Sequence, residues 1–339
     1  MRNKLFNCFA GGALLLWSGL LSGCSDTEVI RNLSIEEKES DLLVFNVSAP
    51  ESFCTRASSD HVLRFTAKLF EGKYRNNTGG VKYLATKQAT ATADGKSTIV
   101  FQVPEGEYQI LLFADYIPIN SEPDENGIYP DAYYNTTSKT ESIEMIAFTR
   151  RDDPFDNTNI NNENYDCFYA ETELIKKTAD KYEKDFTLKR AVAKVRVISN
   201  TTNTTSDIQS ISFSKFSYGS NFSIDGQSVL YNNFPDYLSS RTYTDMTDPS
   251  QNEIFYFYSL APISESNNKL TQINFTVNFK DGTKRTIDIP SGIVTIKQNY
   301  ITTIRGNFLA DPEPELGDII LHLDSDENWD GNTNISVDY

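Results

Sequence analysis

The side chains that could carry out catalysis are few and widely spaced in this chain. Its 339 residues include two histidines, His61 and His322, and each stands in a run of alternating apolar and polar residues. The short patterns that place a nucleophile, a zinc ligand pair or a phosphate-binding loop are absent from the sequence. Paired carboxylates have no such signature, but catalytic acids usually lie in clefts rich in tryptophan, and beyond residue 24 the chain keeps only Trp329. We therefore predict that the protein is not an enzyme and uses no cofactor.

One segment has the spacing of the first half of a calcium-binding loop. In Asp326–Gly331, side-chain oxygens stand at Asp326, Asn328 and Asp330 and a glycine follows them. The position that should hold a bidentate glutamate is Val337, and turns rich in Asp, Asn and Gly recur throughout the chain. The pattern favours an ordinary turn, and no metal site is predicted.

The N-terminal segment predicts export and attachment to lipid. Arg2 and Lys4 precede the apolar run Phe9–Leu21, which is shorter than the roughly 20 apolar residues of a membrane-spanning helix. The run ends in Leu21-Ser22-Gly23-Cys24, which resembles the bacterial lipobox. We predict that residues 1–23 are a signal peptide and that Cys24 is acylated, by palmitate among other chains, and anchored in the outer membrane. A plain secretory signal with a chance cysteine is the alternative.

Two other cysteines remain outside this segment. Cys54 and Cys167 could pair in a disulfide after export. Because Phe168 and Tyr169 follow Cys167, a buried thiol at that position is the favoured interpretation.

The net charge excludes one class of partner. Without the signal segment, which has two basic residues and no acidic ones, the chain keeps 29 basic and 47 acidic residues and a net charge of −18. A surface this acidic repels nucleic acid and anionic lipid. Asp26 and Glu28, directly after the cysteine, resemble the acidic export signals of surface lipoproteins in Bacteroidetes. We expect a protein at the cell surface with no nucleic-acid partner.

Short strands are the elements that must position these residues. Apolar and polar residues alternate in seven runs, which is the period of a half-buried strand. The runs are Val62–Phe70, Ser97–Val103, Glu107–Tyr116, Ala191–Ser199, Gln209–Tyr218, Ile254–Ala261 and Gln272–Phe279. Pro104–Gly106 and Asp281–Gly282 stand between such runs and predict hairpin turns. The predicted fold is all-β, with two β-sandwiches in series.

The predicted boundary between the sandwiches lies near Lys184. The Asn-rich stretch Arg150–Asp166 reads as a long surface loop inside the first sandwich, and the charged stretch Lys176–Asp185 precedes a strong strand. The predicted divisions are a signal peptide (1–23), a tether with the first strand (24–56), two sandwiches (57–184 and 185–316) and a C-terminal strand (317–339).

Five segments, two of which overlap these runs, also carry a family resemblance. In chain order they are Leu111–Tyr116, Tyr133–Thr137, Asp166–Ala170, Thr187–Val197 and Asn299–Leu309. Together, behind a lipobox, they resemble the fimbrillin-type lipoproteins of Bacteroidales, the subunits of type V fimbriae. One position departs from the family pattern, because Cys167 stands where alanine is usual.

The resemblance implies a fold and a route of assembly. It implies two transthyretin-like β-sandwiches, and a maturation protease that cuts the exported lipoprotein after an arginine and releases a first strand. A terminal strand of another fimbrial subunit then fills the opened groove, in a homo- or heteropolymer. Arg56 matches the cleavage position and Ala57 would be the new N-terminus. A loop arginine without a role is the alternative, since polar loops are cut by proteases in any case.

The two ends of the chain share one pattern of side chains. Each has three large apolar residues on one face of a short strand. We predict that the first set belongs to the displaced strand and the second to the donor strand: Leu43, Phe45 and Val47, and Ile319, Leu321 and Leu323.

Two functions from different classes are compatible with these observations. The first is a structural subunit of a surface fimbria that supports adhesion. The second is a monomeric, lipid-anchored binding module, for example for glycans, because the tyrosines of Tyr129–Asn135 could stack on sugars. The first is favoured by the ordered set of motifs.

Overall fold

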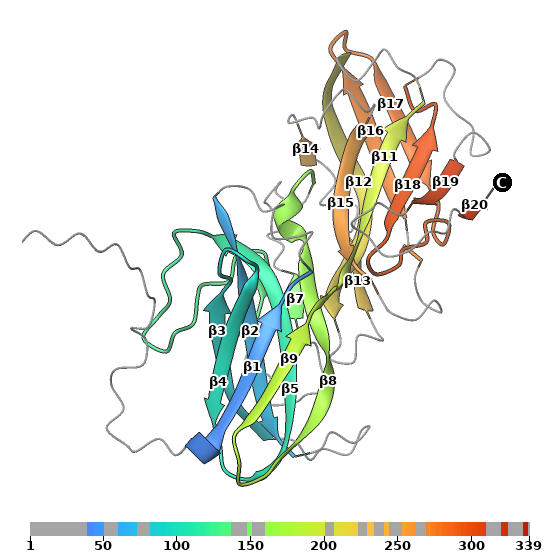
Figure 1. Cartoon of the computed structure of the whole chain (residues 1–339). Coiled ribbons are helices and arrows are strands. Elements are labelled where there is room, and N and C mark those ends of the chain that lie inside the picture. The colour runs from blue at the N-terminus through green and yellow to red at the C-terminus, as the bar shows by residue number, and fades with distance from the viewer. Residues whose placement is uncertain are drawn as a thin grey trace, which may run out of the picture. The chain divides into compact units, whose positions relative to one another are not determined.

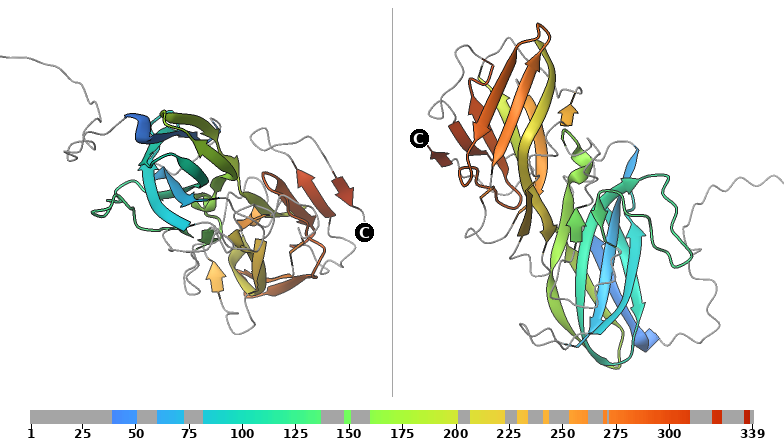
Figure 2. Two further views of the ribbon diagram at one scale, coloured as in Figure 1. Left: turned by 90° about the horizontal axis from the view of Figure 1, so that it is seen from below. Right: turned by 180° about the vertical axis from the view of Figure 1, so that it is seen from behind.

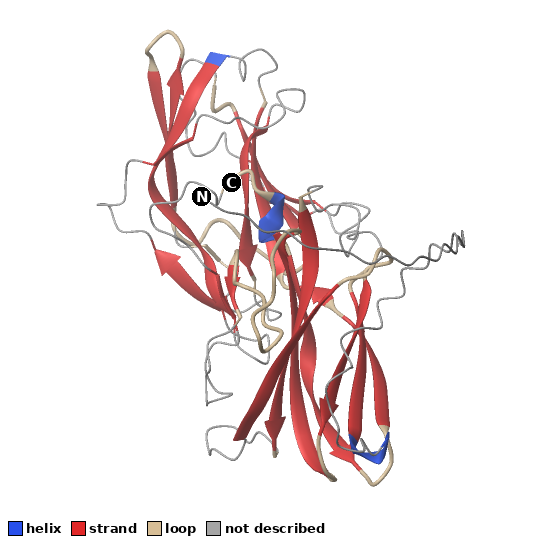
Figure 3. Cartoon of the chain, turned by 90° about the vertical axis from the view of Figure 1, so that its left-hand side faces the viewer, coloured by secondary structure: helices blue, strands red, loops and turns tan. Residues whose placement is uncertain are grey.

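The computed structural model describes residues 39–50, 60–72, 82–136, 148–150, 160–200, 207–222, 229–233, 241–243, 253–261, 269–270, 272–309, 320–324 and 335–337. Strands make up nearly all of the regular structure in these ranges (Figure 3), and the 3-10 helices η1 (Glu39–Asp41) and η4 (Glu163–Tyr165) are three residues each. The all-β prediction is confirmed. Among the described residues, no helix combines the length and the apolar character needed to cross a membrane.

The first group of strands forms two sheets (Figure 1). The three-stranded sheet has the order β4-β1-β9, with β4 at Lys96–Gln102, β1 at Leu42–Ser48 and β9 at Tyr182–Thr187. The five-stranded sheet, which faces the reader in the right-hand view of Figure 2, has the order β10-β8-β5-β2-β3. Its strands are β10 (Lys189–Arg190), β8 (Cys167–Lys177), β5 (Gly106–Pro118), β2 (His61–Glu71) and β3 (Lys82–Thr90).

The second group of strands also forms two sheets. One has the order β15-β11-β18-β19-β20, with β15 (Glu253–Leu260), β11 (Val192–Ser199), β18 (Ile301–Gly306), β19 (Ile320–Asp324) and β20 (Ile335–Val337). The other has the order β17-β16-β12-β7-β6, and β13 and β14 also pair with β12. Its strands are β17 (Lys284–Ile289), β16 (Ile273–Phe279), β12 (Ile208–Phe222), β7 (Phe148–Arg150), β6 (Tyr134–Asn135), β13 (Val229–Asn233) and β14 (Arg241–Tyr243).

Each group encloses its own apolar core. In the first group the core is formed by side chains from both sheets, among them Phe45 and Phe101 from one and Phe65 and Phe168 from the other. In the second group Phe255 packs edge-on against Phe213 and Phe275, with ring centroids 5.0 and 5.1 Å apart. Two sheets that bury their facing sides against each other are the arrangement of a β-sandwich.

The alternating runs predict the strands well. Every run named above forms a strand. In β4 and β16 the buried residues alternate with more exposed ones, as a strand with one buried face requires, whereas β2, β5 and β15 are buried on both faces over most of their length. The turn at Asp281–Gly282 joins the antiparallel strands β16 and β17, and Gly282 has φ +88°, which glycine adopts without strain.

Two local predictions were wrong. Pro104–Gly106 is not a hairpin turn, because β4 pairs with β1 whereas β5 pairs with β2 and β8. The turn carries the chain from one sheet to the other. The stretch Arg150–Asp166 is not a surface loop throughout, since Ile160 and Asp166 are buried at its end.

The chain contributes β6 and β7 to the second group, returns to the first group in β8, β9 and β10, and passes to the second group again at β11. The proposed break at Lys184 lies inside β9, which pairs with β1. Cys167 is completely buried, as its aromatic neighbours predicted. Cys54 and the calcium-like segment Asp326–Gly331 lie outside the described residues.

Candidate functional site

The first strand of the described chain is the middle strand of its sheet. β1 pairs with β4 in antiparallel register, Leu43 opposite Phe101 and Val47 opposite Ser97. On its other edge β1 runs parallel to β9, with Phe45 opposite Lys184. Figure 1 shows β1 between these two neighbours. Both backbone edges of β1 are therefore used, and without β1 the edges of β4 and β9 that pair with it would lose their partner.

The inward face of β1 completes the core of the first group. Leu43 and Phe45 have no exposed surface and Val47 is 1% exposed. The ring of Phe45 lies edge-on to Phe101 at 6.1 Å and to Phe186 at 5.8 Å. Burying three such side chains contributes roughly 5–9 kcal/mol, while ordering the backbone of seven residues costs a comparable amount. The net free energy that β1 contributes is therefore small, and the loss of β1 would expose an apolar groove.

The outward face of β1 carries two polar side chains with partners on neighbouring strands, Asn46 and Ser48, and the Ser48 hydroxyl lies 3.4 Å from the Phe186 carbonyl oxygen and 3.3 Å from the Thr187 hydroxyl. The Asn46 amide donates hydrogen bonds to Glu183 (3.1 Å) and Asp185 (2.9 Å) of β9, and its oxygen accepts one from the Thr98 hydroxyl (3.1 Å) of β4. Hydrogen bonds from Lys181 and then from Asn46 lower the pKa of Glu183. Asn46 thus bridges both neighbours of β1.

A buried ammonium group lies at the start of β1. Lys177, only 4% exposed, donates hydrogen bonds to the carbonyl oxygens of Thr178 and Asp180, both at 3.1 Å, and to that of Ser40. An ammonium group has three N–H donors. The segment before β1 therefore supplies one of the acceptors that make this buried charge tolerable.

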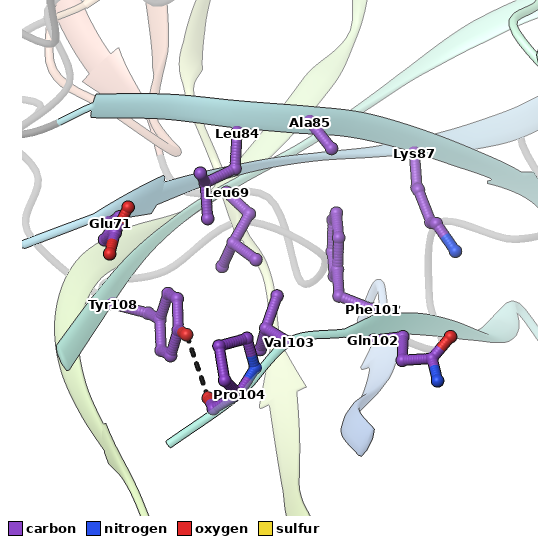
Figure 4. Close-up of a pocket in the computed structure, with 10 residues that line it drawn as sticks. All are labelled: Leu69, Glu71, Leu84, Ala85, Lys87, Phe101, Gln102, Val103, Pro104 and Tyr108. Carbon is purple, nitrogen blue, oxygen red and sulfur yellow. Dashed lines mark hydrogen bonds between the residues drawn. The ribbon is translucent and has the colours of Figure 1, made fainter. Parts of the chain in front are cut away.

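A cavity of about 390 Å³ lies beside the groove, between the edge strands β3 and β4 (Figure 4). Its walls are mostly apolar, with Leu69, Phe101 and Val103 among them. The Tyr108 hydroxyl donates to the Pro104 carbonyl at 2.9 Å, and the Lys87 ammonium lies 5.6 Å from the centre of the Phe101 ring. The cavity is the open seam between the two sheets rather than a cluster of reactive groups.

His61, one of the two candidate histidines, has neighbours at both ring nitrogens. One nitrogen lies 2.9 Å from a carboxylate oxygen of Asp60 and the other 2.8 Å from the Tyr133 hydroxyl. Among the described residues no group of three or more His, Cys, Asp or Glu side chains could hold a metal ion.

The residues proposed for processing and donation are described in part. Cys24, Arg56, Ala57 and Ile319 lie outside the described residues. The backbone of β19 pairs with β18, placing Leu321 opposite Ile304, and also with β20. The structure does not bring the two ends together, because β1 and β19 belong to different sheets.

A buried charge cluster that no local pattern predicted lies in the five-stranded sheet of the first group. Arg64 on β2 donates to both carboxylate oxygens of Asp115 on β5, at 2.9 and 2.7 Å, and to Asp131 at 3.1 Å. Burial raises the pKa of Asp115 to about 6, although Arg64 opposes the shift. Burial also lowers the pKa of Lys68 to about 8. The available signals were Arg64 and Lys68 inside the run Val62–Phe70 and Asp115 inside the run Glu107–Tyr116.

The fold and the central position of β1 define an all-β sandwich protein whose first strand completes a core formed by later strands. Residues 33–338 match a family described as a family of unknown function (DUF6562). The chain belongs to this family. No curated protein matches the sequence.

Several solved structures resemble this chain at low identity. The fimbrial anchor protein Mfa2 of Porphyromonas gingivalis is 14% identical, with a TM-score of 0.44 over 85% of this chain and 97% of its own. The tip fimbrial protein Mfa3 of the same organism is 15% identical, with a TM-score of 0.42 over 84% and 98%. A Bacteroides thetaiotaomicron protein, provisionally described as polysaccharide-binding, is 14% identical, with a TM-score of 0.48 over 85% and 96%.

Proposed function

We propose that the chain is a structural subunit of a cell-surface fimbria and supports adhesion. In this proposal it is exported as a lipoprotein anchored through Cys24 in the outer membrane. A protease cuts after Arg56, and other subunits join by placing a strand where β1 lay. Such a subunit needs neither a catalytic centre nor a cofactor.

The position of β1 is the observation that carries this proposal. β1 precedes every other described strand in the chain, yet it lies between β4 and β9. A single cut of the backbone between β1 and β2 would therefore break the covalent link between this middle strand and the following strands of the sandwich. The vacated site would have an apolar floor and two unpaired backbone edges, which a strand of similar pattern can satisfy.

The source of the replacing strand is the C-terminal segment of a second subunit in this proposal. Residues 319–324 repeat the apolar alternation of β1. To act as a donor, this segment must leave its pairing with β18 and β20. The free energy that favours the exchange grows with the apolar surface and the unpaired backbone edges that are left open in the acceptor.

The N-terminus of the protein on cells tests the proposal. We expect the surface form to begin at Ala57 and to give a ladder of bands on a mildly denaturing gel. Arg56→Ala should keep residues 24–56 and give full-length monomers, whereas Arg31→Ala, the matched control, should be cut and assemble normally. Assembled fimbriae whose subunits retain residues 24–56 would refute the cleavage step. A discrete monomer that binds an oligosaccharide would favour the binding-module alternative.

A further inference from the structure

The apolar face of the β1 site does not define the register of a replacing strand. A slip of one residue turns every side chain to the opposite face, but a slip of two residues keeps apolar side chains inward. Leu43, Phe45 and Val47 are all inward and differ mainly in size. The backbone edges of β4 and β9 repeat with the same period. A further signal must therefore come from the outward face.

The outward positions of β1 differ in chemistry. Val44 is 7% exposed and stands opposite Val100 of β4 and Glu183 of β9, so it has one apolar and one acidic neighbour. Two residues further on, Asn46 faces carboxylates on one side and the Thr98 hydroxyl on the other. The first position therefore holds a buried apolar side chain and the second a hydrogen-bond donor.

All the hydrogen-bonding groups of the Asn46 amide are used at this position. Its NH₂ group has two N–H donors, and it donates to Glu183 and to Asp185. Lys181 lies 2.8 Å from Glu183 and partly balances the pair. A carboxylate in place of Asn46 would lose both donated bonds and face two like charges. An amide, an ammonium or a protonated imidazole could donate to both carboxylates, and a neutral imidazole to one of them.

We infer that Glu183, Asp185 and Thr98 form a recognition site that selects the strand replacing β1 and sets its register. This inference rests on the proposed function. The site takes a hydrogen-bond donor or a cation at the position of Asn46, with apolar residues on either side of it in the chain.

The occupant that fits this site is a strand from a second copy of this chain. With residues 319, 321 and 323 at the positions of Leu43, Phe45 and Val47, His322 falls at the position of Asn46. An imidazole donates an N–H in its neutral and its protonated form. In that register Ile320 falls at the position of Val44, so the second copy matches the outward face at both positions.

Peptide binding to the cut protein tests the inference. The protein that begins at residue 24 is cut after Arg56, and the released segment is removed in denaturant. The remaining chain is then refolded with a fluorescent peptide of residues 42–48. Two peptides, residues 42–48 and residues 319–324, are compared by fluorescence anisotropy. Each is measured unchanged and with an aspartate substitution, Asn46→Asp in the first and His322→Asp in the second. We expect each aspartate peptide to bind at least about tenfold more weakly than its parent, because it loses solvent-exposed hydrogen bonds to the carboxylates of Glu183 and Asp185 and places a like charge beside them.

Acceptor variants separate this effect from general loss of affinity. In the double variant Glu183→Gln/Asp185→Asn the discrimination against aspartate should disappear, while Glu105→Gln, an exposed change in the turn after β4, should leave it intact. Equal binding of parent and aspartate peptides would overturn the inference and leave strand replacement standing. Failure of every peptide, including that of residues 42–48, would refute strand replacement and the inference with it.

Discussion

The substitution Phe45→Ala tests whether β1 is present in the uncut chain and absent from the assembled polymer. The Phe45 ring has no exposed surface and makes edge-on contacts with Phe101 and Phe186. Truncating a buried phenylalanine to alanine costs about 3–5 kcal/mol, because transfer free energy and packing are both lost. Domains are stable by only about 5–15 kcal/mol. Urea denaturation of the uncut chain should therefore show a large loss of stability.

The same change should have no effect on assembled subunits. If cleavage removes β1, a polymer built from Phe45→Ala protein contains no residue 45, and its dissociation temperature should equal that of the unchanged protein. Phe255→Ala is the matched control, since Phe255 is equally buried in the second core and remains in the polymer. It should weaken both forms. A polymer weakened by Phe45→Ala as strongly as by Phe255→Ala would show that β1 stays in place, and the reasoning would fail.

Three further changes probe the anchor, the donor strand and a buried charge. Cys24→Ala should move the uncut protein, which still carries residues 24–56, from the membrane fraction to the soluble one or leave the signal peptide attached; unchanged membrane association of the uncut protein would contradict acylation. Leu321→Asp should block assembly, because a carboxylate placed on the groove floor costs several kcal/mol, whereas Asp324→Asn should assemble normally; equal behaviour in a gel-ladder assay would refute the donor assignment. Burial lowers the pKa of Lys68 to about 8 from 10.5, so the stability it contributes is complete above pH 10.5 and lost as the pH falls through 8. Relative to Lys68→Met, the free energy of unfolding of the unchanged chain should rise by about 3 kcal/mol between pH 8 and 10.5 in denaturant titrations. The exposed control Lys87→Met keeps Lys68, so the unchanged chain should show no such rise relative to it. An equal rise relative to both variants would contradict the assignment.

The strands and the buried face of β1 could be predicted from the sequence. Alternation identifies a strand and its inward side because both depend on neighbouring residues of one segment. It placed Leu43, Phe45 and Val47 on one face, and all three lie in the core. The same local reasoning placed Cys167 inside, from its aromatic neighbours.

The candidate recognition site could not be predicted in this way. Asn46 reads as an ordinary polar residue in β1, and Glu183 follows it by 137 positions in the chain. Only the parallel pairing of β1 with β9 brings the amide and the carboxylates together. Arg64 and Asp115 are a similar case, since they meet because β2 and β5 are neighbours.

Strand identity, the inward faces and the acidic character of this protein were determined by the sequence alone, because each is a property of adjacent residues or of composition. The partners of each strand were decided by the tertiary structure. A turn such as Pro104–Gly106 can close a hairpin or cross between sheets with the same residues, and the choice depends on which distant edge and apolar face are available. For that reason the first strand of the chain became the middle strand of a sheet formed with β4 and β9, a placement that no local pattern specifies.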